Sequence, residues 1–148
     1  MNAIYYSSGS NTFEGSYMKD WLNDTTVDGF LANLREPEKF IVMDAKWNAT
    51  ATDNTSSKPS ETTIVESAVG LLNIYEYTRI KGYLNNGLYW CTLTPEASVT
   101  WSIYCVDEGN IGRNALSGPI GFRPAINLRS DVKIASGSGT ESDPYRLS

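Results

Sequence analysis

The pattern of apolar and polar positions predicts two helices near the start of the chain. Apolar residues recur every three to four positions over about residues 14–23, which is the period of a helix that turns one face toward a core. A second segment of this kind covers residues 27–34. Pro37 is expected to end it, because proline lacks the N–H that an interior helical position needs. A short strand over residues 3–6 is expected to precede both helices.

Short β-rich segments follow in the middle of the chain. Residues 40–43, 62–65 and 68–72 are rich in Ile, Val and Leu, so each is predicted to be strand-like. Asn73 is a good helix cap, and it stands before a predicted helix over residues 74–80 that ends at the following Lys-Gly pair. These elements are expected to lie next to the two N-terminal helices.

The pattern of the last third of the chain predicts a meander of short strands. The Asn-Asn-Gly sequence at residues 85–87 is a strong turn signal, and further Gly-, Asp- and Ser-rich turns follow it. The predicted strands are residues 88–93, 99–106, 110–114, 121–128, 132–135 and 145–147. Helices followed by a run of strands indicate an α+β fold.

The length of 148 residues is that of one domain, so we expect residues 1–148 to form a single unit. Residues 49–61 consist almost entirely of Thr, Ser, Asn, Asp and Ala. Such a segment is too polar to bury, and it predicts an exposed, mobile insertion in the domain.

A turn followed by a strand at residues 118–128 is the most distinctive part of the chain. Pro124 lacks an N–H for a strand ladder, so it predicts an edge, a bulge or the first position of a strand. Arg123 stands between an aromatic residue and this proline. Its five N–H donors suit it to bind neighbouring loop carbonyls, which would be a structural role.

Three sequence blocks resemble the C-type-lectin-like fold as bacteria and phages use it. They are Gly-Phe-Arg-Pro-Ala at residues 121–125, Tyr-Leu-Asn-Asn-Gly-Leu-Tyr-Trp-Cys-Thr-Leu-Thr-Pro at residues 83–95, and Gly-Ser-Gly-Thr-Glu-Ser-Asp-Pro-Tyr-Arg-Leu at residues 137–147. The group includes formylglycine-generating-enzyme-like domains and the variable proteins of diversity-generating retroelements. The three blocks also resemble surface or pilin-like proteins of Firmicutes. The resemblance implies two short helices flanking a twisted, mostly antiparallel sheet with long loops.

Composition excludes several classes of function. The formal net charge of −5 argues against nucleic acid as a partner, because nucleic-acid binding needs a basic surface. No apolar run approaches the ~20 residues that span a bilayer, so no membrane insertion is expected. The chain has no histidine, which excludes His-based acid–base catalysis and His-ligated metals. The start of the chain runs directly into a predicted strand, which indicates a piece of a longer protein. The resemblance to surface and pilin-like proteins implies that this protein is exported and displayed on a cell surface.

The two cysteines, Cys91 and Cys105, lie in neighbouring predicted strands and could face each other across a hairpin. A disulfide in an exported protein and two buried free thiols both fit this position. A redox pair is a third interpretation, since formylglycine-generating enzymes use cysteines for copper-dependent oxidation. Their reactive cysteines lie only a few residues apart, whereas these are 14 apart.

No cofactor or metal site is predicted. Animal C-type lectins bind calcium through Glu-Pro-Asn and Trp-Asn-Asp motifs, and neither motif occurs here. Phosphate-binding loops, nucleophile elbows and dinucleotide fingerprints are also missing from the sequence.

The interval between the signature blocks mixes aromatic residues with small polar ones, which is typical of an adaptable binding surface. In retroelement-diversified proteins the corresponding interval holds the variable residues. By resemblance, the candidate ligand-binding face consists of Trp90, Thr92, Glu96, Ser98, Thr100, Trp101, Ser102, Tyr104, Asp107, Asn110, Arg113 and Asn114.

The alternative for the aromatic members of this face is that they pack the core. Strand alternation from Val99 onward places Val99, Trp101, Ile103 and Cys105 on one side, and this more apolar side is expected to face inward. Tyr104 is on the other side and is therefore the better candidate for contact with a ligand.

The sequence thus favours a non-enzymatic binding module, adhesin-like or receptor-like, whose partner is a protein or cell-surface ligand. It leaves the oligomeric state open. A purely structural surface or pilin domain is one alternative. An oxidase of the formylglycine-generating type is the other.

Overall fold

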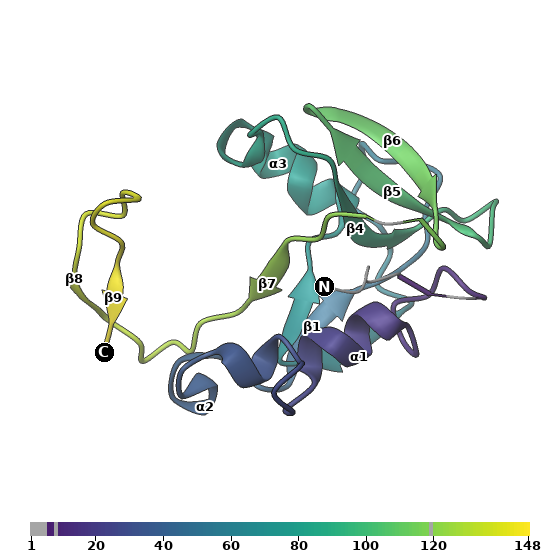
Figure 1. The fold of residues 1–148 in the computed structure, drawn as a ribbon. Helices are drawn as coiled ribbons and strands as arrows, with labels where there is room; N and C mark the ends of the chain where they lie inside the picture. The colour runs from purple at the N-terminus through teal and green to yellow at the C-terminus, as the bar shows by residue number, and fades with distance from the viewer. Residues whose placement is uncertain (1–5, 8, 119) are drawn as a thin grey trace.

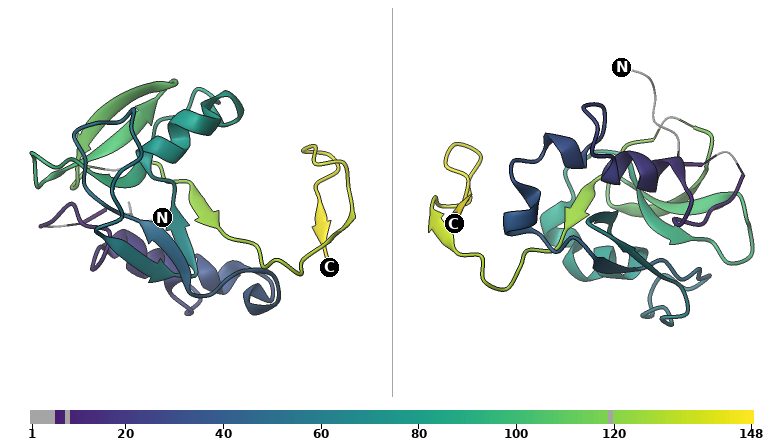
Figure 2. Two further views of the ribbon diagram at one scale, coloured as in Figure 1. Left: turned by 180° about the vertical axis from the view of Figure 1, so that it is seen from behind. Right: turned by 90° about the horizontal axis from the view of Figure 1, so that it is seen from below.

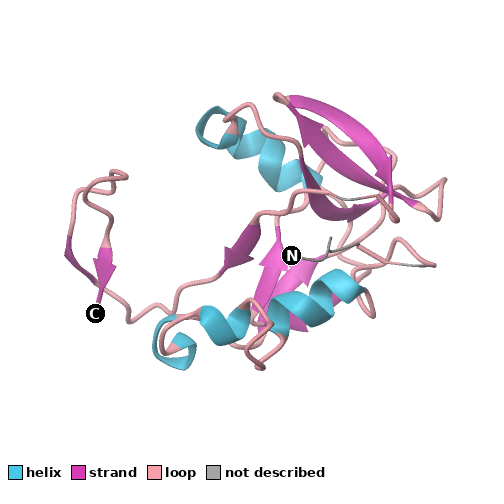
Figure 3. Ribbon diagram, in the orientation of Figure 1, coloured by secondary structure: helices cyan, strands magenta, loops and turns pink. Residues whose placement is uncertain are grey.

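The structure is a computed structural model that describes residues 6, 7, 9–118 and 120–148. It is an α+β fold with few helices and several small antiparallel sheets, as Figure 3 shows. Of the strand predicted over residues 3–6, all but Tyr6 lies outside the described residues. Within the described residues, no helix is both long enough and apolar enough to span a bilayer.

The first predicted helix is confirmed as α1 (Tyr17–Asn23), which starts three residues later than expected. Ser16 defines this start, because its hydroxyl accepts a hydrogen bond from the N–H of Lys19 at 3.1 Å. The inward face of α1 buries Met18 and Leu22 completely.

The second predicted helix is wrong in extent. Only a short 3₁₀ turn, η1 (Leu31–Asn33), forms within it. Before this turn, the carboxylate of Asp24 accepts a hydrogen bond from the N–H of Thr26 at 2.8 Å. This bond holds residues 24–26 in a turn, which competes with helix formation. Pro37 begins a helix, α2 (Pro37–Phe40), where it was expected to end one, since the first helical position needs no N–H.

The strands form four separate sheets (Figure 1). The pairs are β1 (Ala45–Asn48) with β2 (Ile64–Ser67), β3 (Val69–Leu71) with β7 (Pro124–Ile126), and β8 (Ile134–Ser136) with β9 (Arg146–Leu147). The fourth sheet has three strands in the order β4 (Trp90–Pro95), β5 (Ser102–Asp107) and β6 (Asn110–Ala115).

The strand predicted over residues 40–43 is absent. Ile41 makes an isolated bridge to Leu128, and β1 begins only at Ala45. Pro124 is the first residue of β7, one of the three positions that its missing N–H allowed.

Helix α3 (Ile74–Leu84) continues past Gly82, four residues beyond its predicted end. A complete capping box explains its start: Asn73 and Glu76 exchange side-chain-to-backbone hydrogen bonds of 2.9 Å. Its last carbonyl, that of Leu84, accepts a hydrogen bond of 2.7 Å from Arg123, whose guanidinium also lies 4.8 Å from the ring centre of Trp90. Arg123 therefore has a structural contact of the kind expected for it.

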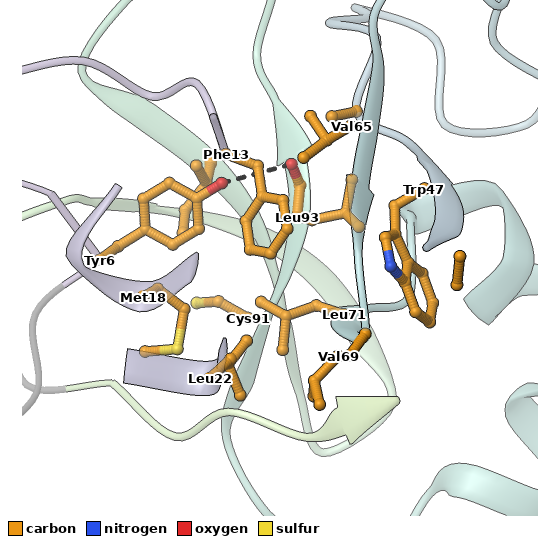
Figure 4. Close-up of a cluster of buried hydrophobic side chains, with 14 of the residues drawn as sticks. Tyr6, Phe13, Met18, Leu22, Trp47, Val65, Val69, Leu71, Cys91 and Leu93 are labelled. Atoms are coloured by element: carbon orange, nitrogen blue, oxygen red, sulfur yellow. Dashed lines mark hydrogen bonds between the residues drawn. The ribbon is translucent and has the colours of Figure 1, made fainter. Parts of the chain in front are cut away.

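The core consists of two clusters of buried side chains. In the larger one, Tyr6, Phe13 and Met18 from the N-terminal segment lie against β4, and Tyr6 donates a hydrogen bond to the carbonyl of Leu93 (Figure 4). The smaller cluster lies between α3 and the three-stranded sheet, where Tyr77 meets Trp90 edge-on at 5.5 Å. Both faces of β4 and β5 are therefore covered.

A disulfide joins Cys91 of β4 to Cys105 of β5 within the larger cluster, and both residues are fully buried. The sequence left open whether these cysteines form a disulfide or remain free thiols, and the structure contains the disulfide.

The polar insertion at residues 49–61 is only partly as predicted. Most of it is exposed, but Ala49, Thr50 and Pro59 are buried. Thr52 bridges to Glu96, so the insertion packs against the end of β4.

Candidate functional site

The structure divides the predicted ligand-binding residues into two sets according to their exposure. The exposed residues are Ser98, Thr100, Trp101, Asp107, Asn110 and Arg113, with Asn114 half-buried. The buried residues are Trp90, Thr92, Glu96, Ser102 and Tyr104. The buried set does not form a surface: Trp90 and Tyr104 pack in the cluster under α3, Thr92 and Ser102 are buried in β4 and β5, and Glu96 is buried where β4 leads into the next loop.

The expectation that Trp101 faces inward and Tyr104 outward is wrong. Trp101 precedes β5, which begins at Ser102, so the alternation of the strand does not reach it; 64% of its surface is exposed. Tyr104 does lie on the opposite face from Ile103, but α3 covers that face, and only 2% of Tyr104 is exposed. Of the three aromatic candidates, Trp90 and Tyr104 belong to the core.

The six residues 96–101, here called the Trp101 loop, connect β4 to β5. Buried Asn11 holds this loop from beneath. Its side-chain amide nitrogen donates to the carbonyls of Glu96, Val99 and Ser102 at 3.1, 3.0 and 2.9 Å. The backbone N–H of Asn11 donates to the carbonyl of Thr100 at 3.0 Å. One residue thus binds both ends and the middle of the loop.

The polar insertion supports the same loop from its side. The N–H of Thr52 donates to the carbonyl of Pro95 at 3.1 Å, and the N–H of Ala97 donates to the carbonyl of Thr52 at 3.3 Å. The carboxylate of Asp53 accepts the N–H and the hydroxyl of Ser98 at 3.2 and 3.0 Å. A loop with this many long-range hydrogen bonds is pre-organised, so an exposed side chain on it loses little conformational freedom when it binds.

Beside the loop, Arg113 of β6 joins it to the sheet. Its guanidinium makes an ion pair of 2.9 Å with the buried carboxylate of Glu96 and lies 5.6 Å from the ring centre of Tyr104. Burial raises the pKa of the Tyr104 phenol, and the positive charge of Arg113 opposes that rise. The phenol is therefore neutral at physiological pH.

The Tyr104 hydroxyl has no hydrogen-bond partner, the one such buried side-chain group in the part of the chain that the structure describes. A shallow cavity of about 440 Å³ opens next to it. It is lined by Asp53, Thr55, Tyr104, Ile111, Gly112 and Arg113. Asp53 and Arg113 line this cavity and also bind the Trp101 loop, Asp53 through Ser98 and Arg113 through Glu96.

Replacing Arg113 with alanine is expected to destabilise the protein by about 2 kcal/mol, because the buried carboxylate of Glu96 loses its only ion pair among the described residues. This value allows for the half-exposed guanidinium, which water screens. Thermal unfolding of the Arg113→Ala variant would measure the loss. The same substitution at exposed Arg79 on α3 is the control, and a double variant with Glu96→Gln should recover part of the stability. Equal losses at Arg113 and Arg79 would contradict the role given to this ion pair.

Two predicted residues lie away from the Trp101 loop. Asp107 and Asn110 pair at the turn that ends β5 and starts β6, whereas the loop joins the other end of β5. The structure therefore does not bring them into one site with Trp101.

Sequence reasoning missed Asn11 and Asp53, the two side chains that hold the loop. Asn11 lies in a Ser- and Gly-rich stretch, and Asp53 lies in the polar insertion, so both resemble ordinary turn residues. Their partners are 85 to 91 and 45 residues away, and no local pattern carries that information.

Within the described ranges, no three Cys, Asp or Glu residues are grouped closely enough to hold a metal ion. The arrangement of the site is suited to contact through an aromatic ring and surrounding polar groups. Comparisons of the chain with protein families, with curated proteins and with solved structures give no match.

Proposed function

We propose that this protein is a non-enzymatic binding module that contacts a protein or cell-surface ligand through the Trp101 loop. The observation that carries the proposal is an indole, 64% exposed, on a loop that buried Asn11 fixes with three side-chain hydrogen bonds. An indole exposed to water is unfavourable in free energy, and a ligand that covers it would remove this unfavourable contribution. Fixing its backbone in advance lowers the entropy lost on binding.

The residues next to Trp101 fit a binding role. Ser98 and Thr100 are exposed on the same loop and supply small hydroxyl groups, while Arg113 supplies a partly exposed guanidinium. Tryptophan and arginine are the side chains most often found at the energetic centres of interfaces. Small polar neighbours adapt their hydrogen bonds to different partners.

The two alternatives receive less support. An oxidase of the formylglycine-generating type needs two reduced, accessible thiols, whereas Cys91 and Cys105 are joined in a disulfide and fully buried. A purely structural domain gives no reason to hold a tryptophan in water on a fixed loop.

We extend the proposal to the fold, the location and the diversification of the protein. The fold is C-type-lectin-like, the protein is displayed on a cell surface, and its binding face is diversified by a retroelement. The α+β architecture supports the first, and the disulfide, which persists in oxidising compartments, supports the second. A reverse transcriptase gene beside a near-copy of the segment encoding residues 90–125 would be the genetic sign of the third.

The proposal predicts that ligands of this protein depend on Trp101. Random peptides displayed on phage would be selected against the immobilised protein, and the selected peptides tested on the Trp101→Ala variant. Removal of a central tryptophan is expected to weaken their binding by about 2 kcal/mol or more, roughly 30-fold. Binding would be measured by titration calorimetry.

The matched control is Tyr83→Ala, which removes an aromatic ring that is 93% exposed at the end of α3. It should leave the affinities unchanged. Peptides that bind Trp101→Ala as tightly as the unmodified protein would contradict the proposed binding surface. Tyr104→Ala is unsuitable as a test of this surface, because it would open a cavity in the core.

A further inference from the structure

The C-terminal hairpin stands apart from the rest of the molecule (Figures 1 and 2). We call residues 129–148 the C-terminal arm. The arm is attached to the body at its first residue, where the N–H of Arg129 donates to the carbonyl of Phe40 at 2.9 Å. Beyond that point β8 and β9 pair with each other, and Lys133 and Ser148 exchange backbone hydrogen bonds of 3.0 and 2.9 Å.

The arm has a defined shape of its own. Asp143 accepts hydrogen bonds from the N–H groups of Ser138 and Gly139 at 2.9 to 3.1 Å, which closes its turn. Gly139 has a φ of +79°, and a Cβ there would fall 2.6 Å from the ring of Tyr145. This position therefore requires glycine, and the Tyr145 ring packs directly on the turn.

No residue of the arm is buried, although all of it is described. Ile134 and Tyr145 are 59% and 55% exposed. Two-stranded hairpins are marginally stable in water unless an apolar face is covered. Within this chain, therefore, the apolar face of the arm is not covered.

The body carries an open apolar groove where the arm begins. Its cavity is about 480 Å³, and Leu34, Phe40, Ile41, Ile126 and Leu128 provide most of its apolar lining, with Leu147 from the arm. Ile126 and Leu128 are 41% and 48% exposed. A single chain thus has an exposed apolar face on its arm and an open apolar groove on its body.

We propose that the occupant of this groove is the C-terminal arm of a second copy of the chain, in a symmetric pair in which each arm packs into the groove of the other. A two-fold axis pairs the same two surfaces twice, so one contact covers both arms and both grooves. The arm leaves the body through a turn at Ser130 and Asp131, which the N–H of Val132 closes by donating to the carbonyl of Arg129 at 3.2 Å.

The distribution of charge favours a second copy over a charged partner. The arm contains three basic and three acidic residues, so the formal net charge of −5 lies on residues 1–128. A neutral arm is not repelled by the acidic body of a second copy, whereas a basic partner would be drawn to the body and not to the arm. The two acidic bodies repel each other, so the dimer is expected to form more readily at higher salt concentration. The groove itself has one charge of each sign, Arg35 and Glu36.

The first test is the oligomeric state, measured by sedimentation velocity from low to high micromolar concentration. The unmodified chain should form a concentration-dependent dimer. Ile134→Asp should raise the dissociation constant at least about 30-fold, because it places a charge on the apolar face of the arm. Val27→Asp, at a side chain that is 82% exposed elsewhere, should leave the dimer intact. A chain that is monomeric at every concentration, or a dimer unaffected by Ile134→Asp, would overturn the proposal.

The second test identifies which chain the arm contacts. Arg35→Cys in the groove and Ser136→Cys on the arm are made in separate chains, mixed and oxidised. Exchange of arms predicts a disulfide-linked pair with one chain of each kind, and Ile134→Asp in the Ser136→Cys chain should abolish it. If a chain carrying both cysteines instead forms its link within the monomer, the arm closes on its own groove and the proposal is wrong.

Discussion

Replacing Asn11 with alanine should destabilise the protein by about 3 kcal/mol, since three carbonyl groups lose a donor from a buried side chain. Two of these hydrogen bonds are fully buried, where water cannot replace the donor without entering the protein. For a domain of this size, such a loss lowers the unfolding midpoint by roughly 6–12 °C. Thermal unfolding followed by circular dichroism would measure it.

The control for this prediction is Asn86→Ala, which removes the same side chain at an exposed position. It is expected to change stability by less than about 0.5 kcal/mol. Amide hydrogen exchange provides a second measurement: in Asn11→Ala the amides of the Trp101 loop should exchange faster, while those of α3 change only with global stability. Equal stability of the two variants would show that Asn11 does not hold the loop.

Removal of the disulfide should have an effect of similar size. The Cys91→Ala, Cys105→Ala double variant is expected to lose about 3 kcal/mol, because a link across a loop of this length restricts the unfolded chain by that amount. The two alanines also leave unfilled volume in the core, which adds to the loss. Chemical denaturation in urea would measure it.

The presence or absence of a reducing agent is the internal control. The unfolding midpoint of the unmodified protein should fall when reductant is present during unfolding, whereas that of the double variant should not move. Because both cysteines are fully buried, the folded protein is expected to be reduced slowly. An unmodified protein whose midpoint is the same with and without reductant would contradict the disulfide.

Elements defined by local signals were predictable from the sequence. The turn at residues 85–87 and the cap at Asn73 located β4 and α3, because a turn residue or a cap acts on its immediate neighbours. The same reasoning failed for residues 27–34. There the side chain of Asp24 and the close approach at Gly29, where a Cβ would lie 2.2 Å from the Asp24 carbonyl, make a turn where the apolar period suggested a helix.

The candidate site was less predictable than the fold. Strand alternation correctly separated Ile103 from Tyr104, but it carried no information on whether α3 would cover the second face of β5. The predicted alternation also includes Trp101, but β5 begins one residue later, at Ser102. The residue that holds the loop, Asn11, acts across 85 residues and more. Contacts of that range depend on tertiary packing, which no single-sequence pattern reports.

The central claim is that Trp101 on its fixed loop is the contact surface for a ligand. The chain has four tryptophans, which give separate indole N–H signals in a ¹⁵N-resolved NMR spectrum. Those of Trp21 and Trp47 are bonded internally, to Asp28 and Ser67, and Trp90 is buried. Titration of a selected peptide should therefore shift the Trp101 indole together with the amides of residues 96–102, and leave the other three indoles in place. Saturating shifts elsewhere in the protein, with the Trp101 signal unmoved, would contradict the claim.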